Sequence, residues 1–174
     1  MLATGESIVT AKMIVVMGVA GAGKTTVGQL LAAELRCEFV DADTLHPVAN
    51  IQKMKQCIAL TDADRASWLT AIHARIVESF QLEQSLVVAC SALKQRYRDT
   101  LADGVPIVWV YLKGSEEVIR ARMLQRQHHF MKAQMLASQF TDLEEPTDAI
   151  VIDVAVAPSV AVRQIINSLS RQAS

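Results

Sequence analysis

Short apolar runs alternate with amphipathic stretches along this chain. Five runs rich in Val, Ile and Leu begin at Met13, Cys37, Ser85, Val105 and Ala149, and the segments between them carry apolar residues at helical spacing. Continuous apolar runs are typical of strands buried on both faces of a parallel sheet, and helical spacing indicates the helices that cover it. We therefore expect an α/β fold: a five-stranded parallel sheet with helices on both faces, right-handed crossovers and ligands at the carboxyl ends of the strands.

The first apolar run leads directly into a glycine-rich turn and then into a helical pattern. Gly18, Gly23, Lys24 and Thr25 match G-x-x-x-x-G-K-[ST], the phosphate-binding loop, in the strand-then-helix context that this motif requires. Its glycines, Gly21 included, let the backbone adopt positive φ and point successive N–H groups at an anion. We expect Lys24 to reach the β and γ phosphates of a nucleotide and Thr25 to offer its hydroxyl to Mg²⁺. The alternative, a tight turn with an exposed lysine, is disfavoured by the flanking strand and helix.

The loop as a whole is expected to hold the phosphates of ATP. Gly28, one turn into the following helix, is expected where helix and sheet approach closely. No N-K-x-D sequence follows a strand, which argues against guanine specificity and favours a small-molecule phosphoryl transferase. The expected nucleotide contacts are Gly18, Val19, Ala20, Gly21, Ala22, Gly23, Lys24, Thr25 and Thr26.

The second apolar run, residues 37–41, ends in the acidic pair Asp41 and Asp43. Carboxylates at the carboxyl end of a parallel strand, beside a phosphate-binding loop, lie where open α/β sheets bind ligands. One of them could hold Mg²⁺ through water, and the other could accept a proton from a substrate hydroxyl. Capping is the alternative role, because aspartate readily caps turns and helices.

About residues 43–80 are expected to form a helical region that holds the substrate. Pro47 fits the first turn of a helix on which Lys53 and an amide side chain share one side, next to the acidic pair. Basic and amide groups there could hold a polar or carboxylate substrate. His46 is either a packed or capping histidine or a substrate contact.

A second helix of this region is expected to begin at Thr61 or Asp62, one of them serving as N-cap. The apolar stripe that follows is core. Asp64 and Arg65 either touch the substrate or form a structural pair. A later charged helix is expected to begin within residues 91–94, and its Arg98 could point back to the site.

The helix expected from about residue 115 carries Arg120, Arg122 and Arg126. Arginines three or four positions apart can converge on a transferring phosphoryl group, or they can balance the dipole at the end of their own helix. The two adjacent histidines that follow would point apart on a helix. We therefore expect a lid over about residues 122–146 rather than a metal site.

Composition places limits on these functions. The chain has 174 residues, 51% of them hydrophobic, and a formal net charge of -1. This suits a single domain over residues 1–174, with residues 1–12 as a frayed tail, and argues against bulk binding to nucleic acid or an anionic membrane. Three cysteines without C-x-x-C spacing suggest neither a disulfide framework nor a zinc site, and fit a cytoplasmic location. We expect no signal peptide and no membrane span.

Several blocks of the sequence resemble the short P-loop gluconate kinases. Besides the phosphate-binding loop, these are D-x-D-x-x-H-P-x-x-N-x-x-K-M from Asp41, L-x-D-x-D-R-x-x-W-L from Leu60 and C-S-A-L-K-x-x-Y-R-D from Cys90. R-x-x-x-R-x-x-H-F from Arg122, followed by Q-M-L and Q-F-x-x-L-x-E-P, resembles their lid. The blocks span roughly residues 15–153, and several are too long to recur by chance.

The resemblance implies a P-loop kinase fold with a substrate-binding helical insert and a lid, related to shikimate and nucleoside monophosphate kinases. It implies a cytosolic homodimer that uses ATP and Mg²⁺ to phosphorylate the 6-hydroxyl of D-gluconate. Lys24, Asp43, Arg122 and Arg126 would be catalytic, with Asp43 as the base. Thr25 and Asp41 would serve the metal, and the candidate gluconate contacts are Asp43, His46, Lys53, Arg98 and His129.

The chain departs from the usual pattern of these kinases in the substrate region and the lid. Cys57, Ala59 and Ser67 stand where Gly, Pro and Pro are usual, and His128 replaces a glycine beside the lid histidine. These changes leave the phosphate chemistry intact but leave substrate preference and the hinge motion of the lid open. A kinase for another small sugar acid or hydroxy acid is thus an alternative. A catalytically silent nucleotide-binding regulator is a second one, against which the intact catalytic candidates argue.

Overall fold

Five parallel strands form one sheet in the order β2-β3-β1-β4-β5. The computed structural model describes residues 11–56, 58–125 and 135–172. Strand β1 is central, with Val15 opposite both Val88 and Trp109. The predicted parallel sheet is confirmed, and the strands lie in their predicted ranges to within one residue at the far end of β4. The strands are β1 (Met13–Met17), β2 (Glu38–Asp41), β3 (Leu86–Ala89), β4 (Ile107–Lys113) and β5 (Ile150–Asp153).

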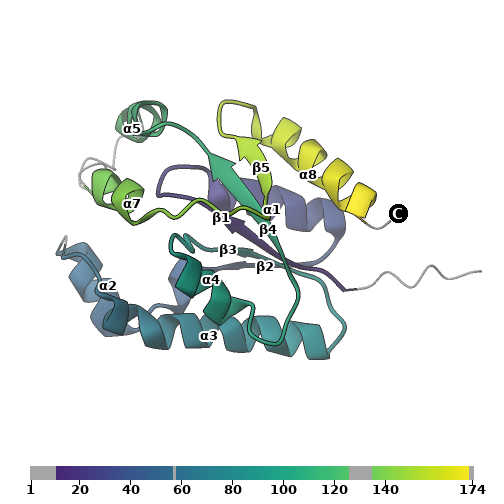
Figure 1. Ribbon diagram of the computed structural model, residues 1–174, viewed down its shortest axis with the longest axis horizontal. Coiled ribbons are helices and arrows are strands. Elements are labelled where there is room, and N and C mark those ends of the chain that lie inside the picture. The colour runs from purple at the N-terminus through teal and green to yellow at the C-terminus, as the bar shows by residue number, and fades with distance from the viewer. Residues whose placement is uncertain (1–10, 57, 126–134, 173–174) are drawn as a thin grey trace, which may run out of the picture.

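Helices cover both faces of this sheet, as predicted (Figure 1). Helices α1 (Lys24–Leu35) and α8 (Pro158–Gln172) lie on one face, and α3 (Asp62–Gln81) and α4 (Gln95–Leu101) lie on the other. Successive side chains of a strand point to opposite faces, so Ile14 and Val16 pack in the core under α1 and α8. Val15 and Met17 pack in the core under α3.

The first helix meets the sheet closely. A Cβ added at Gly28 of α1 would lie 2.6 Å from a ring carbon of Phe39 in β2. Only glycine fits there, which confirms the predicted close approach.

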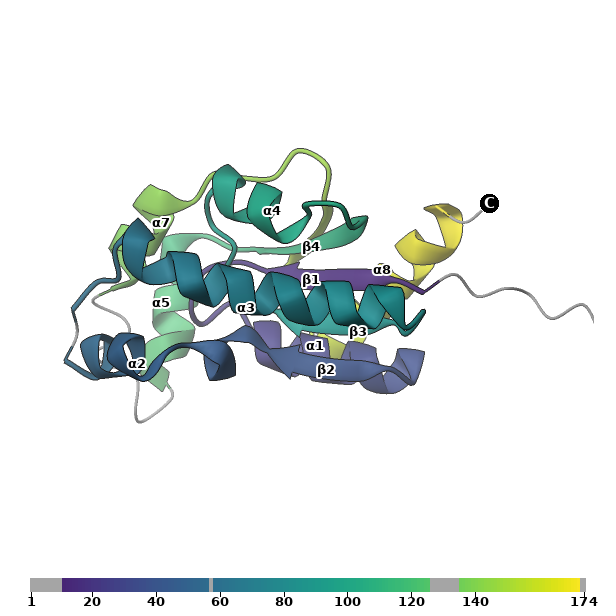
Figure 2. The same ribbon diagram turned by 90° about the horizontal axis from the view of Figure 1, so that it is seen from below.

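Three short helices gather at the carboxyl edge of the sheet (Figures 1 and 2). They are α2 (Val48–Lys55), α5 (Glu116–Gln125) and α7 (Leu136–Asp142), and a 3-10 turn, η1 (Ala42–Leu45), leads from β2 towards α2. Strand β1 has β3 on one side and β4 on the other, so the strand order reverses there. Open α/β sheets bind ligands at such a point.

Helix starts agree with the sequence to within a residue or two. Thr61 caps α3 through a capping box with Asp64, as predicted. Pro47 is the residue before α2 rather than part of its first turn, and α4 begins at Gln95, just after the predicted range. Within the described ranges, no helix combines the length and apolar character needed to cross a membrane.

Candidate active site

The glycine-rich loop between β1 and α1 adopts the backbone shape that its sequence predicts. Gly18, Gly21 and Gly23 have φ of 141°, 80° and 101°. At Gly18 an added Cβ would also lie 2.9 Å from the carbonyl oxygen of Leu112, so this position needs glycine for space as well. The Lys24 ammonium donates to the Val19 carbonyl at 3.0 Å, which keeps the positive charge over the loop.

The acidic pair lies beside the start of α1. The Thr25 hydroxyl donates to one Asp41 carboxylate oxygen at 2.8 Å, and the main-chain N–H of Asp43 donates to the other at 3.1 Å. Asp41 therefore caps η1, which was the alternative role considered for it, and also faces the loop threonine. Its role towards a metal stays a prediction. The Asp43 carboxylate is exposed and lines the cavity in front of the loop, which is described below.

Thr25 and Asp41 have the donor chemistry of a magnesium site. Among the described residues no cluster of three His, Cys, Asp or Glu side chains could hold a metal, so the chain offers no complete cage. Mg²⁺ prefers hard oxygen ligands and usually combines one or two protein groups with water and substrate phosphates. The hydroxyl and carboxylate fit that mode of binding.

A cavity of about 360 Å³ opens in front of the loop. This volume is within the range of small-molecule sites. Arg122 of α5 and Gln139 of α7 close one side of it, and Arg65 and Trp68 of α3 close the other. Of the residues predicted for the site, the cavity brings together Ala20, Gly21, Gly23, Lys24, Thr25, Thr26, Asp41, Asp43, His46 and Arg122. Its apolar wall includes Met54, Leu60, Met123 and Met135.

His46 is packed and also faces this cavity. Its ring stacks on Trp68 with a centroid distance of 4.3 Å and an interplanar angle of 9°. Burial lowers the pKa of His46 although Asp43 nearby favours the charged form. The amide nitrogen of Asn50 lies 3.4 Å from Nδ1, and an amide nitrogen only donates, so the proton of the neutral ring belongs on Nε2.

Lys53 and Arg98 do not line the cavity, and both bond to other groups of the chain, so their contact with the substrate stays a prediction. The Lys53 ammonium lies 2.7 Å from the Asp64 carboxylate and, together with Thr61, lowers the pKa of Asp64 to about 2. Arg98 is 2% exposed and donates to the carbonyls of Ala92 and Leu93 at 2.9 and 3.1 Å.

Through these two bonds Arg98 holds an unusual turn. Ala92, between β3 and α4, has φ of 43°, a conformation that costs energy for a residue with a Cβ. This turn brings the neighbouring Ser91 to the cavity wall. Arg126, His128 and His129 of the predicted lid, and Cys57, lie outside the described residues.

Two cavity residues were not singled out firmly by the sequence. Arg65 donates from Nη1 to the Leu60 carbonyl at 2.7 Å and to the Tyr97 hydroxyl at 3.4 Å, while its side chain borders the cavity. The side-chain carbonyl of Gln139 accepts from the main-chain N–H of Ala20 at 2.7 Å. No periodicity indicates this contact, because the two residues are 119 positions apart.

A second cavity of about 440 Å³ adjoins the loop on its other side. Gly21, Gly23, Thr26 and Arg122 line both cavities, so the two lie on either side of these residues. The far wall is the segment between β5 and α8, residues 154–158. Nothing in the sequence indicated that the small apolar side chains of this segment would line a cavity beside the loop.

Cys90, the residue after β3, is a buried hydrophobe. It is 1% exposed, and burial raises the pKa of its thiol to about 12. A thiol with such a pKa is not a nucleophile at neutral pH.

Comparison with known proteins agrees with this geometry. Residues 20–170 match the family model described as shikimate kinase. A gluconokinase of Arabidopsis thaliana is 38% identical, covering 96% of this chain and 97% of that protein, and the thermoresistant gluconokinase of Escherichia coli K12 is 42% identical, covering 80% and 83%. The crystal structure of a gluconokinase from Sinorhizobium meliloti 1021 aligns with a TM-score of 0.85 at 40% identity, covering 94% of each chain. The chain therefore belongs to the shikimate kinase family and, within it, to the gluconokinases.

Proposed function

We propose that this protein transfers the γ-phosphoryl group of ATP to the 6-hydroxyl of D-gluconate, which gives ADP and 6-phospho-D-gluconate. One observation carries the proposal: a single cavity is bordered by the phosphate loop with Lys24, by the Thr25–Asp41 pair, by Asp43 and by Arg65. This cavity therefore has groups suited to a nucleotide, a metal, a hydroxyl and a carboxylate.

The nucleotide would use both cavities. Loop N–H groups and Lys24 suit the β and γ phosphates, and Thr25 with Asp41 would hold Mg²⁺ between them. The second cavity continues from the loop to residues 154–158, where small apolar side chains and main-chain groups suit the flat adenine ring. When bound, the metal would neutralise phosphate charge.

Gluconate would enter from the side of α3. The planar guanidinium of Arg65 is suited to a carboxylate, which it can bind with two parallel hydrogen bonds. His46 would offer its Nε2–H to a hydroxyl of the sugar chain, since its lowered pKa keeps the ring neutral.

Asp43 is the proposed base. The 6-oxygen of gluconate forms a bond to the γ-phosphorus as the bond from that phosphorus to the bridging oxygen of ADP breaks, and the hydroxyl proton goes to Asp43. Such transfer depends mainly on positioning and on neutralising charge. Lys24 and Arg122 supply positive charge within the described residues, and Arg126 and His129 are proposed to add to it from the lid.

The remaining proposals concern context. We propose a homodimer that works in the cytosol, as the resemblance to gluconate kinases implies. Light scattering coupled to size-exclusion chromatography would measure the molar mass of the assembly against the 19.0 kDa chain.

The reaction is tested by ADP release over a panel of gluconate, other sugar acids, shikimate and nucleoside monophosphates. Turnover with gluconate alone supports the proposal, and turnover with another acid redirects it to that substrate. Lys24→Met is the matched inactive control. Absence of turnover with every acceptor would leave the silent regulator as the better description.

A further inference from the structure

Helix α7 contacts the phosphate loop through Gln139. The Gln139 carbonyl accepts from the N–H of Ala20 at 2.7 Å, in the middle of the glycine-rich turn. The next loop residue, Gly21, touches α5, since an added Cβ there would lie 2.6 Å from Met123. Leu136 of α7 is fully buried in the core that also contains Met123. The position of α7 therefore depends on the shape of the loop.

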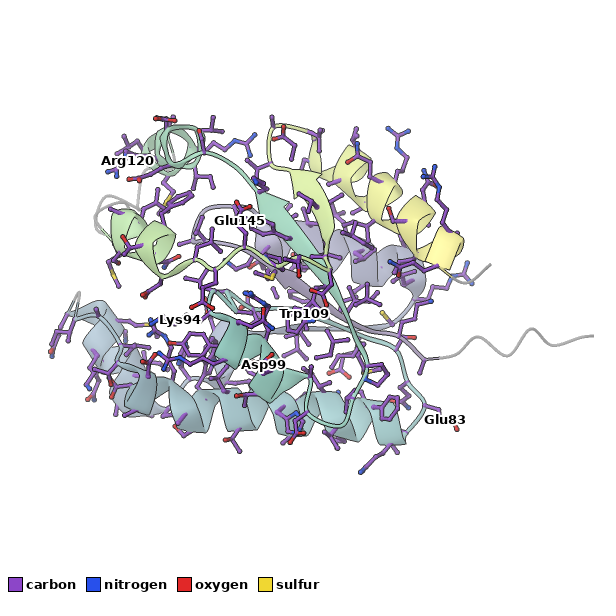
Figure 3. The ribbon with its side chains drawn as sticks, viewed as in Figure 1. Glu83, Lys94, Asp99, Trp109, Arg120 and Glu145 are labelled. Atoms are coloured by element: carbon purple, nitrogen blue, oxygen red, sulfur yellow. The ribbon has the colours of Figure 1, made fainter. Side chains whose placement is uncertain are left out.

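The other end of α7 contacts the acceptor side through Lys94. The Lys94 ammonium lies 3.3 Å from the carboxylate of Asp142, the last residue of α7, and 3.6 Å from that of Asp62, the first residue of α3. In Figure 3, Lys94 lies between α7 above and α3 below. Gln139 and Asp142 are three positions apart, so they lie on the same side of the helix.

Two further contacts hold the end of α7 in place. The main-chain N–H of Glu144 donates to the Leu93 carbonyl at 2.9 Å, and the Glu144 carboxylate accepts from the N–H of Gln95 at 2.6 Å. Both acceptor and donor belong to the turn that carries Lys94. With the Lys94–Asp142 pair, three contacts therefore join the end of α7 to this turn, and a shift of α7 would break them or move the turn with it.

From Asp62 the contacts continue to the proposed carboxylate ligand. The Tyr97 hydroxyl donates to Asp62 and accepts from Arg65 at 3.4 Å. Lys94 also lies over the Tyr97 ring, 5.8 Å from its centroid. Polar contacts and one short helix therefore connect Ala20 in the nucleotide loop with Arg65 in the acceptor wall.

We infer that Gln139 and Lys94 are positioning residues through which α7 couples the nucleotide site to the acceptor site. This inference rests on the proposed function, since it assigns the two ends of the connection to ATP and gluconate. Binding of a nucleotide fixes the loop, the loop fixes α7 through Gln139, and α7 fixes Asp62 and Arg65 through Lys94. Each ligand therefore binds more tightly when the other is present.

The test measures this coupling directly. Calorimetry gives the dissociation constant of D-gluconate with and without a saturating, non-hydrolysable ATP analogue and Mg²⁺, and the ratio of the two constants is the coupling factor. Coupling between sites is typically about 5- to 150-fold, and the reciprocal experiment must give the same factor. Wild-type protein should show a factor in this range.

Lys94→Met should lower the coupling factor at least about fivefold, towards one, while the affinity for each ligand alone changes little. Asp142→Asn removes the carboxylate charge through which α7 pairs with Lys94, and it should lower the coupling factor in the same way. Lys94→Arg keeps the positive charge and should retain part of the coupling factor. Thr141→Val is the control on the same helix, because within the described ranges its hydroxyl bonds only to the Ala137 carbonyl of α7, at 3.1 Å.

The outcomes are distinct. A wild-type factor of one, or an unchanged factor in both Lys94→Met and Asp142→Asn, overturns the inference while the kinase proposal stands. A folded wild-type protein that binds no nucleotide would instead overturn the proposed function. Loss of coupling in Thr141→Val as well would show that any change in α7 suffices, which contradicts the specific contacts.

Discussion

Asp41 and Asp43 are two positions apart in the chain, but their carboxylates have different surroundings. Both oxygens of Asp41 are engaged, one by Thr25 and one by the N–H of Asp43. Both side chains line the cavity, and the Asp43 carboxylate is the more exposed of the two. This difference in hydrogen bonding supports the proposed division of roles, with Asp41 on the metal side and Asp43 as the proton acceptor.

Asp43→Asn should lower kcat about a hundredfold or more, because a general base typically contributes that much. Affinity for ATP should change little, since the amide has the same shape and the loop is untouched. Steady-state kinetics with separate nucleotide-binding measurements give the comparison. Equal losses in kcat and in ATP affinity would make Asp43 part of the scaffold rather than the base.

Arg65→Met should raise the KM for gluconate about tenfold or more, because a hydrogen bond to a charged group contributes about 1.5–3 kcal/mol. Arg65→Lys should recover only part of the affinity, since an ammonium lacks the planar fork. Arg120→Met is a suitable control, because Arg120 pairs with Glu116 on α5 and does not line the cavity. An unchanged KM in Arg65→Met would show that the carboxylate binds elsewhere.

At the scale of elements, the start of α3 carries Arg65, the proposed carboxylate ligand. Thr61 accepts from the N–H of Asp64, and the Asp64 carboxylate accepts from the N–H of Thr61, so the first turn is closed in both directions. Lys53 of α2 adds an ion pair to the same carboxylate and thereby connects the two helices of the substrate region.

Thr61→Ala should lower the free energy of unfolding by about 1 kcal/mol, the usual effect of losing an N-cap side chain. Urea unfolding measures this change. Thr70→Ala on the same helix is the control, because the Thr70 hydroxyl bonds only to the Ala66 carbonyl one turn back. Equal effects of the two changes would mean that the cap contributes nothing.

The same carboxylate predicts a pH dependence of stability. The pKa of Asp64 is about 2 in the folded chain, where Lys53 and Thr61 bond to it, against an ordinary 3.8. Because the pKa of Asp64 is lower in the folded chain, its contacts stabilise the fold at pH values above the unfolded pKa of 3.8. This contribution to the free energy of unfolding is lost as the pH falls from 3.8 towards 2. The difference in urea midpoint between wild type and Asp64→Asn should therefore shrink over that interval. A constant difference would contradict the lowered pKa.

At the scale of the whole molecule, ligands should stabilise the fold by binding only the folded state. MgATP at one hundred times its dissociation constant adds about 2.7 kcal/mol. For a domain of this size that raises Tm by about 5–10 °C. Lys24→Met should keep the ligand-free Tm but lose most of this shift, and chelation of Mg²⁺ should reduce it in wild type. Thermal unfolding with and without nucleotide measures both, and an undiminished shift in Lys24→Met would remove its assigned role.

The sequence predicts the sheet and the phosphate loop well because both follow from short-range patterns. The apolar runs define strands, and the spacing from Gly18 to Thr25 defines a turn whose φ values glycine allows. Long-range contacts are different. The bonds from Arg98 to the carbonyls of Ala92 and Leu93 are one example, because no pattern in the sequence shows that this turn needs a guanidinium. The contact between Gln139 and Ala20 depends on how helices pack, which no local pattern encodes.

Three thioether side chains, Met54, Met123 and Met135, stand in the wall of the main cavity. Methionine is unbranched and polarisable, so these side chains can adapt to substrates of different length and do not select among them by size. Discrimination among related polyhydroxy acids should then depend on the fixed polar groups of the cavity, such as Arg65 and His46. Exchanging those groups, rather than the methionines, is the direct route to a different acceptor.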